Sequence, residues 1–444
     1  MFDFKKGYYA DVRIEDRFST YVSYRNGNME ECKENSVKKA FIRVFDGEKW
    51  YYASTYKLAD INGELDKLYA CATKNDNIND DKIVKRFEVN VYDNLRFAND
   101  CVKNVDIKEK SKFLTDRLQY LQNDYVKMNV ATYIDRYSEY EFYSSKGASL
   151  HYDFQLSGAV FVIALANEKD NFTNYTQKCC DAFSKVTFSE RELKDFVDEG
   201  VHFLNNAKSV TAGAYPVIFA PEVAGVFAHE SFGHKSEADF MIGDETMRKE
   251  WAIGKKVGSD ILSIYDSGLE EGSGYVLFDD EGTRTKKTYL IKNGVLTGRL
   301  HSVITAADMD EELTGNARAI NTDYEPIVRM TSTIIDAGKD TFDDLVKGIK
   351  HGYFIKTVKH GSGMSTFTIA PNIAYEIVDG KIGEPVKIAV ITGNVFETLG
   401  LIDGLSNEKI VCSSISGGCG KMEQFPLPVS DGGPYVRISK MNIQ

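Results

Sequence analysis

Two histidines five positions apart constrain this chain more than any other feature of its sequence. His229 is followed directly by Glu230, and His234 closes the motif His-Glu-Ser-Phe-Gly-His. The apolar residues 215–220 just before this segment are typical of a short buried strand, and Pro221 suits the first turn of a helix. The sequence therefore predicts a strand that leads directly into a helix carrying both histidines.

The spacing of the histidines does not fit a regular α-helix. At about 100° per residue, positions 229 and 234 lie roughly 140° apart around the helix axis, so their side chains would diverge. A π-bulge adds one residue to a turn and would bring them back to one side. Gly233, directly before the second histidine, tolerates such a break. We therefore expect a local distortion at the motif if both imidazoles hold one ion.

The residue types of the motif are those of a catalytic zinc site. Such a site uses three protein ligands and keeps a fourth position for water. Glu230, beside His229, is placed to accept a proton from that water and to deliver it to a leaving amine. Taken alone, the motif leaves an alternative open, in which His229 and His234 are ordinary, partly buried histidines.

A resemblance to a known family favours the metal site. The motif and its flank, His234–Asp239, closely resemble the TldD/PmbA family, also called modulators of DNA gyrase. The N-terminal half resembles that family more loosely. Six further blocks of the C-terminal half resemble the family in the same order: 278–283, 290–298, 314–318, 326–331, 417–421 and 426–429.

The resemblance also implies a third metal ligand. The TldD branch of the family binds zinc through a His-Glu-x-x-x-His motif and a C-terminal cysteine, and the PmbA/TldE branch lacks the motif. By this resemblance His229, His234 and Cys419 are the Zn²⁺ ligands. Cys419 lies in a Gly-Gly-Cys-Gly loop whose small residues allow the sulfur to approach an ion, and zinc and Lys421 would both favour its thiolate. Cys412 is the rival ligand, but it lacks the glycines.

These features lead to one favoured function and two alternatives. The resemblance implies a zinc-dependent metallopeptidase that hydrolyses small or unfolded peptides in a cavity enclosed by a dimer. The partner would be a second copy or a motif-lacking family member. One alternative is a non-catalytic regulator or binding partner linked to gyrase or to a toxin, against which a complete ligand set argues. The other is a zinc hydrolase of a non-peptide amide, which the motif spacing leaves open.

Other polar residues are candidates for supporting roles. Metal-bound histidines usually donate their second N–H to a carboxylate or carbonyl, and Glu237 and Asp239 are the nearest candidates, with Glu237 preferred. Asn316 and Arg318 are candidates to bind a substrate carboxylate or carbonyl, since arginine suits that geometry. The acidic run 279–281 is either a solvated turn or a rim that holds a substrate amine or positions the zinc ligands.

The order of predicted elements gives the fold class. The first half mixes helices with antiparallel strands, and the chain after residue 239 is strongly β, which together indicate an α+β protein. Ser189–Glu192 is a capping-box signature that opens a helix to about Ala207, which we interpret as the crossover. We expect a mixed α/β N-terminal domain, 1–208, and a β-rich C-terminal domain, 209–444, that carries the metal-site helix.

Charge and composition exclude several other classes of protein. The net charge is −12 and basic clusters are short, so direct nucleic-acid binding is not expected. No apolar run approaches the roughly 18 residues of a membrane span, and the N-terminus lacks a signal-peptide apolar region. Seven thinly spread cysteines suggest free thiols in a reducing compartment. These observations predict a cytoplasmic protein.

Overall fold

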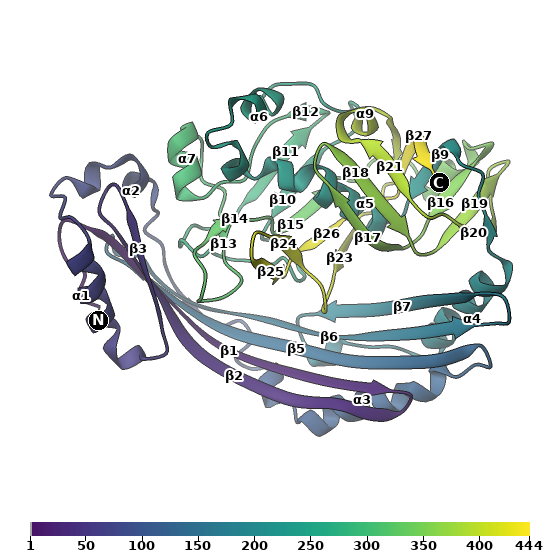
Figure 1. Cartoon of the computed structure of the whole chain (residues 1–444), viewed down its shortest axis with the longest axis horizontal. Helices are drawn as coiled ribbons and strands as arrows, with labels where there is room; N and C mark the ends of the chain where they lie inside the picture. Colours follow the sequence, from purple (N-terminus) through teal and green to yellow (C-terminus); the bar gives the residue numbers. More distant parts are fainter. Residues whose placement is uncertain (1) are drawn as a thin grey trace.

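A computed structural model describes residues 2–444, and within them the N-terminal half of the chain forms one long, curved, seven-stranded sheet (Figure 1). Its order is β3-β2-β1-β5-β6-β4, and β7 also pairs with β6. The turn at Asn26 and Gly27 has positive φ at both residues, as a tight hairpin requires, and it joins the long strands β1 and β2. The strands are β1 (Tyr9–Arg25), β2 (Asn28–Phe45), β3 (Trp50–Thr55), β4 (Val91–Asn94), β5 (Val126–Ser144), β6 (Ser149–Ala166) and β7 (Asn171–Cys180).

Most of the N-terminal helices cover the face of this sheet that is turned away from the C-terminal half, whereas α2 packs against α7 of that half (Figure 1). Leu114 of α3 and Leu193 of α4 are buried in one apolar cluster with Phe161 of β6. The predicted capping box at Ser189 and Glu192 is confirmed. The helices and 3₁₀ turns are η1 (Leu58–Asp60), α1 (Ile61–Cys71), η2 (Ile78–Asp80), α2 (Lys82–Arg86), η3 (Val102–Asn104), α3 (Ile107–Leu118), η4 (Gln119–Leu121), η5 (Phe183–Lys185) and α4 (Glu190–Asn206).

The C-terminal half of the described chain is built around a ten-stranded sheet. Its order is β17-β18-β21-β27-β9-β16-β19-β20-β8, and β22 also pairs with β27. The strands are β8 (Lys208–Ser209), β9 (Gly213–Phe219), β16 (His351–Ile355), β17 (Val358–Gly363), β18 (Thr366–Pro371), β19 (Ala374–Val378), β20 (Lys381–Lys387), β21 (Ile391–Asn394), β22 (Ile402–Leu405) and β27 (Val436–Ile443).

Smaller sheets and short helices complete this half. A six-stranded sheet has the order β12-β11-β10-β15-β26-β23, and two hairpins pair β13 with β14 and β24 with β25. The strands are β10 (Ile264–Ser267), β11 (Lys287–Lys292), β12 (Val295–Leu296), β13 (Ala317–Arg318), β14 (Ile327–Val328), β15 (Ser332–Ile335), β23 (Ile410–Ser413), β24 (Cys419–Lys421), β25 (Gln424–Leu427) and β26 (Ser430–Gly433). The helices are α5 (Pro221–Ala228), η6 (His229–Gly233), η7 (His234–Ser236), η8 (Ala238–Met241), α6 (Glu245–Glu250), α7 (Val303–Met309), α8 (Phe342–Lys347) and α9 (Val395–Gly400).

The strand and helix that lead to the histidine motif lie at the centre of this half. Strand β9 pairs with β27 on one side and with β16 on the other, and Pro221 begins α5 directly after it, as predicted. Helix α5 contacts β15, β23 and β26 of one sheet and β9 and β17 of the other. Its Val223 and Phe227 are fully buried. Burial of each side chain stabilises the folded protein by about 1.5–3 kcal/mol relative to leaving it exposed. The motif therefore follows a helix held rigidly between two sheets.

The α+β class predicted from the sequence is confirmed by the mixture of helices and largely antiparallel sheets. The boundary between residues 208 and 209 stays a prediction. Across residues 2–444, none of the helices has the length and apolarity needed to span a bilayer.

Candidate metal centre

A π-helical turn lies where the histidine spacing predicts a distortion. Helix α5 ends at Ala228, and the backbone continues through the π turn η6, His229–Gly233, into a 3₁₀ turn that begins at His234. A π turn holds more residues than an α turn, so positions five apart come to the same side. The two imidazole rings lie with their centroids 5.1 Å apart. The predicted local distortion is confirmed.

Gly233 is required by a close approach within this turn. A side-chain carbon at this position would collide with Met330 Sδ. Met330 is fully buried in the apolar core that surrounds α5. The glycine therefore lets the π turn pack directly against the core beneath it.

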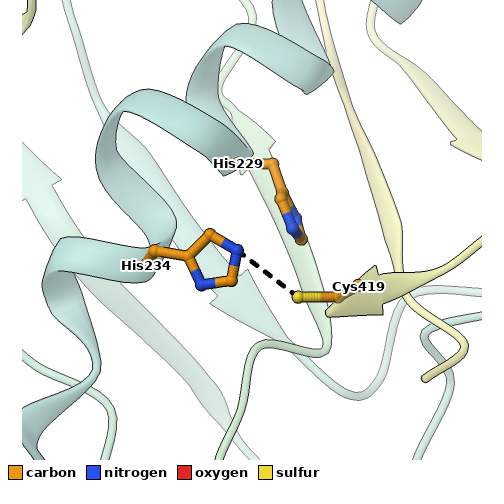
Figure 2. Close-up of side chains that lie close together, drawn as sticks. All are labelled: His229, His234 and Cys419. Atoms are coloured by element: carbon orange, nitrogen blue, oxygen red, sulfur yellow. Dashed lines mark hydrogen bonds between the residues drawn. The ribbon is translucent and has the colours of Figure 1, made fainter. Parts of the chain in front are cut away.

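The two histidines meet Cys419, which arrives from the distant hairpin β24–β25 (Figure 2). One ligand atom from each of the three residues lies within 4.8 Å of the other two, and Cys419 Sγ is 3.5 Å from His234 Nε2. Within residues 2–444 this is the only such group of three or more histidine, cysteine or acidic side chains. Cys412, the rival ligand, lies in β23 outside this group.

The two cysteines differ in charge as well as in position. Burial raises the pKa of Cys419, but the neighbouring His229 and His234 outweigh it and hold the pKa at about 5. Burial and the nearby Asp431 raise the pKa of Cys412 instead. Since metals bind thiolates rather than thiols, Cys419 carries the form of sulfur that an ion needs.

The candidate supporting carboxylates lie on one side of the site. Glu237 Oε2 is 3.2 Å from His234 Nδ1, so the other ring nitrogen faces Cys419. Asp239 contacts no histidine and instead accepts hydrogen bonds of 2.7 and 2.8 Å from Lys421. On the other side, His229 Nδ1 is buried with no hydrogen-bond partner among the described residues. A buried polar atom in that state is typical of a site that holds an ion or a water.

Glu230 lines a cleft of about 980 Å³ together with two of the three candidate ligands, His229 and Cys419. Burial raises the pKa of the Glu230 carboxyl above its ordinary value. The cleft is also lined by Tyr175, Glu222 and Asp431, which the sequence analysis did not single out. Helical spacing would have pointed to Glu222, seven residues before His229, but no local signal brings Tyr175 or Asp431 to this place.

Asn316 and Arg318 lie outside the cleft at the metal site. The Asn316 side chain donates to Asp266 and to the Arg329 carbonyl, both at 2.9 Å. Arg318 donates to the carbonyls of Met330 and Pro428. Both residues are buried, and neither lines the cleft. These hydrogen bonds show that both side chains support the fold, and a role of either residue in binding substrate stays a prediction.

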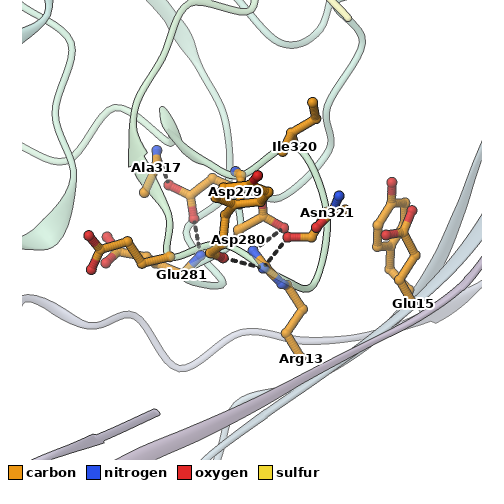
Figure 3. Close-up of polar contacts among 12 residues, drawn as sticks. Arg13, Glu15, Asp279, Asp280, Glu281, Ala317, Ile320 and Asn321 are labelled. Atoms are coloured by element: carbon orange, nitrogen blue, oxygen red, sulfur yellow. Dashed lines mark hydrogen bonds and ion pairs between the residues drawn. The ribbon is translucent and has the colours of Figure 1, made fainter. Parts of the chain in front are cut away.

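The acidic run 279–281 is likewise neither a solvated turn nor part of the metal site (Figure 3). Asp279 accepts hydrogen bonds from the backbone amides of Glu281, Thr283 and Ala317. The two neighbouring carboxylates reach the N-terminal sheet, where Asp280 pairs with Arg13 at 2.9 Å and Glu281 pairs with Arg43 at 3.0 Å. The run therefore joins the two halves of the chain.

Comparison with family models is decisive for classification. Residues 212–444 match the PmbA/TldA metallopeptidase C-terminal domain, and residues 10–75 match PmbA/TldA metallopeptidase domain 1. The chain belongs to the TldD/PmbA family. Members of this family are described as metallopeptidases, and the chain is an enzyme of that class.

Curated TldD/PmbA relatives match over nearly their whole length. A metalloprotease of Methanocaldococcus jannaschii is 30% identical over 97% of this chain and 96% of its own. A metalloprotease of Synechocystis is 31% identical over 97% and 93%. A zinc metalloprotease TldD homolog of Saccharolobus solfataricus is 26% identical over 98% and 96%. These relatives imply a metal, and the histidine–cysteine group is suited to hold one.

Solved structures of TldD/PmbA proteins share the fold. A putative modulator of a DNA gyrase from Thermotoga maritima aligns with a TM-score of 0.79 and 18% identity over 99% of this chain and 96% of its own. TldE from Thermococcus kodakarensis aligns with a TM-score of 0.76 and 15% identity over 98% and 96%. At these identities the likeness concerns the fold alone.

Proposed function

We propose that this chain is a zinc-dependent metallopeptidase that hydrolyses small or unfolded peptides, with Glu230 as the general base. The observation that carries the proposal is the meeting of His229, His234 and Cys419 at a cleft that His229, Cys419 and Glu230 line. Three nitrogen and sulfur ligands are typical of a catalytic zinc site that keeps one position open.

The ligand set and its surroundings fit zinc. A thiolate and two imidazoles are soft and intermediate ligands that zinc accepts in tetrahedral geometry. Glu237 would hold the His234 ring in the orientation that presents Nε2 to the ion. When bound, zinc would supply Lewis-acid chemistry, lowering the pKa of a water molecule and polarising the scissile carbonyl.

Glu230 would move the proton during hydrolysis. Its carboxylate takes a proton from the attacking water and passes it to the leaving amine nitrogen, so that the peptide bond breaks to give a carboxylate and an amine. Burial raises the pKa of Glu230. A higher pKa makes the carboxylate a stronger base, and it keeps more of the protonated form available near neutral pH than an ordinary glutamic acid would have.

The size and composition of the cleft support a peptide substrate. Its volume of about 980 Å³ is at the upper end of the roughly 300–1,000 Å³ typical of small-ligand sites. That space admits a short or extended peptide and excludes a folded domain. Tyr175 and Gln177 of β7 and Val358 of β17 line it, so both polar and apolar groups face a bound chain.

Dimer formation, with a second copy or with a motif-lacking family member, is part of the proposal. The outer edge of β2 supports it, because β3 pairs only with residues 40–45, and within residues 2–444 no other strand pairs with Asn28–Lys39 on that side. Unpaired strand edges are where another chain can add. Light scattering on the purified protein, alone and mixed with such a partner, would measure the assembly.

Metal content and peptide turnover, measured on the same samples, test the function. We expect about one zinc per chain in the wild type and in Glu230→Ala, and loss of zinc in Cys419→Ser. Peptide cleavage should occur only in the wild type, since Glu230→Ala keeps the ion but lacks the base. A wild type that binds no zinc when zinc is supplied, or a Glu230→Ala variant that cleaves peptides normally, would contradict the proposal.

A further inference from the structure

Two buried cations hold the hairpin that delivers Cys419. Arg329, which has no exposed surface, donates to the Cys419 carbonyl at 2.8 Å and to the Gln424 carbonyl at 3.3 Å. Lys421 belongs to the same hairpin and contacts Glu237 and Asp239, in the segment that follows the histidine motif. The hairpin is therefore fixed to its surroundings at the residue that bears the thiolate and two residues beyond it.

Lys421 is surrounded by acceptors. Its Nζ lies 3.1 Å from Glu237 Oε2, 2.7 and 2.8 Å from the two Asp239 oxygens, and 2.9 Å from the Val328 carbonyl oxygen. The Phe240 ring lies beneath the ammonium group, 4.2 Å from its centroid. This lysine is buried, and so is Glu237, whose side chain has no exposed surface.

The Glu237 oxygen that meets Lys421 is the same atom that meets His234. Oε2 lies 3.2 Å from His234 Nδ1 and 3.1 Å from Lys421 Nζ. On the opposite edge of the ring, His234 Nε2 lies 3.5 Å from Cys419 Sγ. Together these contacts form a closed circuit. It runs from Cys419 along the chain to Lys421, then to Glu237, then through His234 and back to the Cys419 sulfur.

We propose that Lys421 is a positioning residue of the metal site, acting on His234 through Glu237. This inference rests on the proposed metallopeptidase function. By holding Oε2, Lys421 keeps Glu237 in the place that orients the imidazole. Because it lies two residues after Cys419 on a short strand, the same contact fixes the thiolate relative to that imidazole. This circuit of contacts couples the ligands His234 and Cys419, which are far apart in sequence.

Lys421 can position the metal site because its ammonium group balances the charges of the Glu237 and Asp239 carboxylates. Without its ammonium group, Glu237 and Asp239 would be two neighbouring carboxylates, one of them fully buried, with no cation between them. Unpaired buried charges are strongly unfavourable, so the segment that carries Glu237 would shift. That shift weakens the Glu237–His234 contact and loosens the geometry that the ion requires.

Zinc affinity of the metal-free protein, measured by competition with a chromophoric chelator, tests this role without relying on activity. Lys421→Met keeps the aliphatic stem and removes the charge. We expect its zinc dissociation constant to rise about 10–100-fold, as is typical when a supporting contact to a metal ligand is lost.

A matched control separates positioning from general destabilisation. Lys110 is also fully buried and pairs with Asp135 at 2.6 Å, but it lies in α3 of the N-terminal half. Lys110→Met should lower the urea midpoint of the metal-free protein while leaving its zinc affinity unchanged. An equal loss of zinc affinity in both variants would show that instability, not position, explains the effect and would overturn the proposal.

A double-mutant cycle tests whether Lys421 acts through Glu237. If it does, Glu237→Gln combined with Lys421→Met should bind zinc no more weakly than Glu237→Gln alone. Losses that multiply in the double variant would overturn the proposed route. If Lys421→Met does not fold, Asp239→Asn serves instead, since it loosens Lys421 at a partly exposed position; a wild-type zinc affinity in that variant would also overturn the proposal.

The outcomes also separate this inference from the function on which it rests. A wild type that binds no zinc contradicts the metallopeptidase proposal itself. A wild type that binds zinc tightly, together with a folded Lys421→Met variant of equal affinity, contradicts only the positioning role.

Discussion

His234 Nε2 and Cys419 Sγ lie 3.5 Å apart although 185 residues separate them in the chain. One side chain follows a helix held between two sheets, and the other belongs to a hairpin near the C-terminus. The site therefore exists only when most of the C-terminal half has folded. Because a metal that binds only this arrangement stabilises it, zinc should raise the unfolding temperature of the protein in a concentration-dependent way.

The charge state of Cys419 in the metal-free protein gives the first prediction. The adjacent histidines hold its pKa at about 5, so the thiolate is complete above that pH and is lost as the pH falls through it. After removal of metal, iodoacetamide should alkylate Cys419 with a rate that falls with a midpoint near pH 5. An ordinary cysteine would lose reactivity below about pH 8.5. Site-resolved mass spectrometry measures the profile.

Cys412 is the internal control for that experiment. It lines the same cleft, but burial raises its pKa, so it should stay unreactive at neutral pH. Added zinc should protect Cys419 and leave Cys412 unchanged. Faster labelling of Cys412 than of Cys419 would reverse our assignment of the third ligand.

The second prediction concerns Glu230. Glu230→Gln preserves the shape of the side chain but removes the base, so kcat for peptide hydrolysis should fall about 10²–10⁴-fold. Zinc content should remain near that of the wild type, because Glu230 is not in the ligand group. Single-turnover kinetics on metal-loaded protein would measure the loss. A fall below tenfold would assign the proton transfer to another group.

Part of the site could be predicted from the sequence because it is local. The strand, the proline at the helix start and the π turn all lie within residues 213–234, where spacing and residue type determine the backbone. The Glu237–His234 contact spans three residues and is local in the same way. Only the family resemblance predicts Cys419 as the third metal ligand, because no local pattern connects it to the histidines.

The rest depends on contacts that a single sequence does not reveal. Asn316, Arg318 and the run 279–281 are polar residues in family-like blocks, and polarity alone suggested roles in binding or at an exposed turn. The fold brings Asp266 to Asn316, Arg13 to Asp280 and Arg43 to Glu281, and no pattern in the sequence predicts these distant contacts. Buried hydrogen-bond networks resemble functional sites in sequence because both need the same residue types.

The third prediction tests the close approach at the π turn. Gly233→Ala forces a methyl group against Met330 Sδ, and overpacking of this kind typically costs about 1–3 kcal/mol. The free energy of unfolding, measured in urea, should fall by that amount, and zinc content should fall with it as the histidines move apart. Met330→Ala in the same chain makes room for the new methyl group. It should therefore restore zinc binding in the double variant, and a double variant that still lacks zinc would show that the glycine is needed for its backbone instead.

The fourth prediction concerns the joint between the two halves of the chain. Arg43 of β2 pairs with Asp11 at 2.7 Å and with Glu281 at 3.0 Å, and all three side chains are buried. Arg43→Met leaves two buried carboxylates without a cation, which should destabilise the protein by about 3–5 kcal/mol. The exposed pair Lys112–Asp116 provides the control, since Lys112→Met should cost no more than about 0.5 kcal/mol. Urea unfolding followed by fluorescence measures both variants. Because Glu281 lies outside the cleft, the metal-loaded Arg43→Met protein should keep its zinc while folded, and loss of zinc without loss of stability would mean that the joint controls the metal site directly.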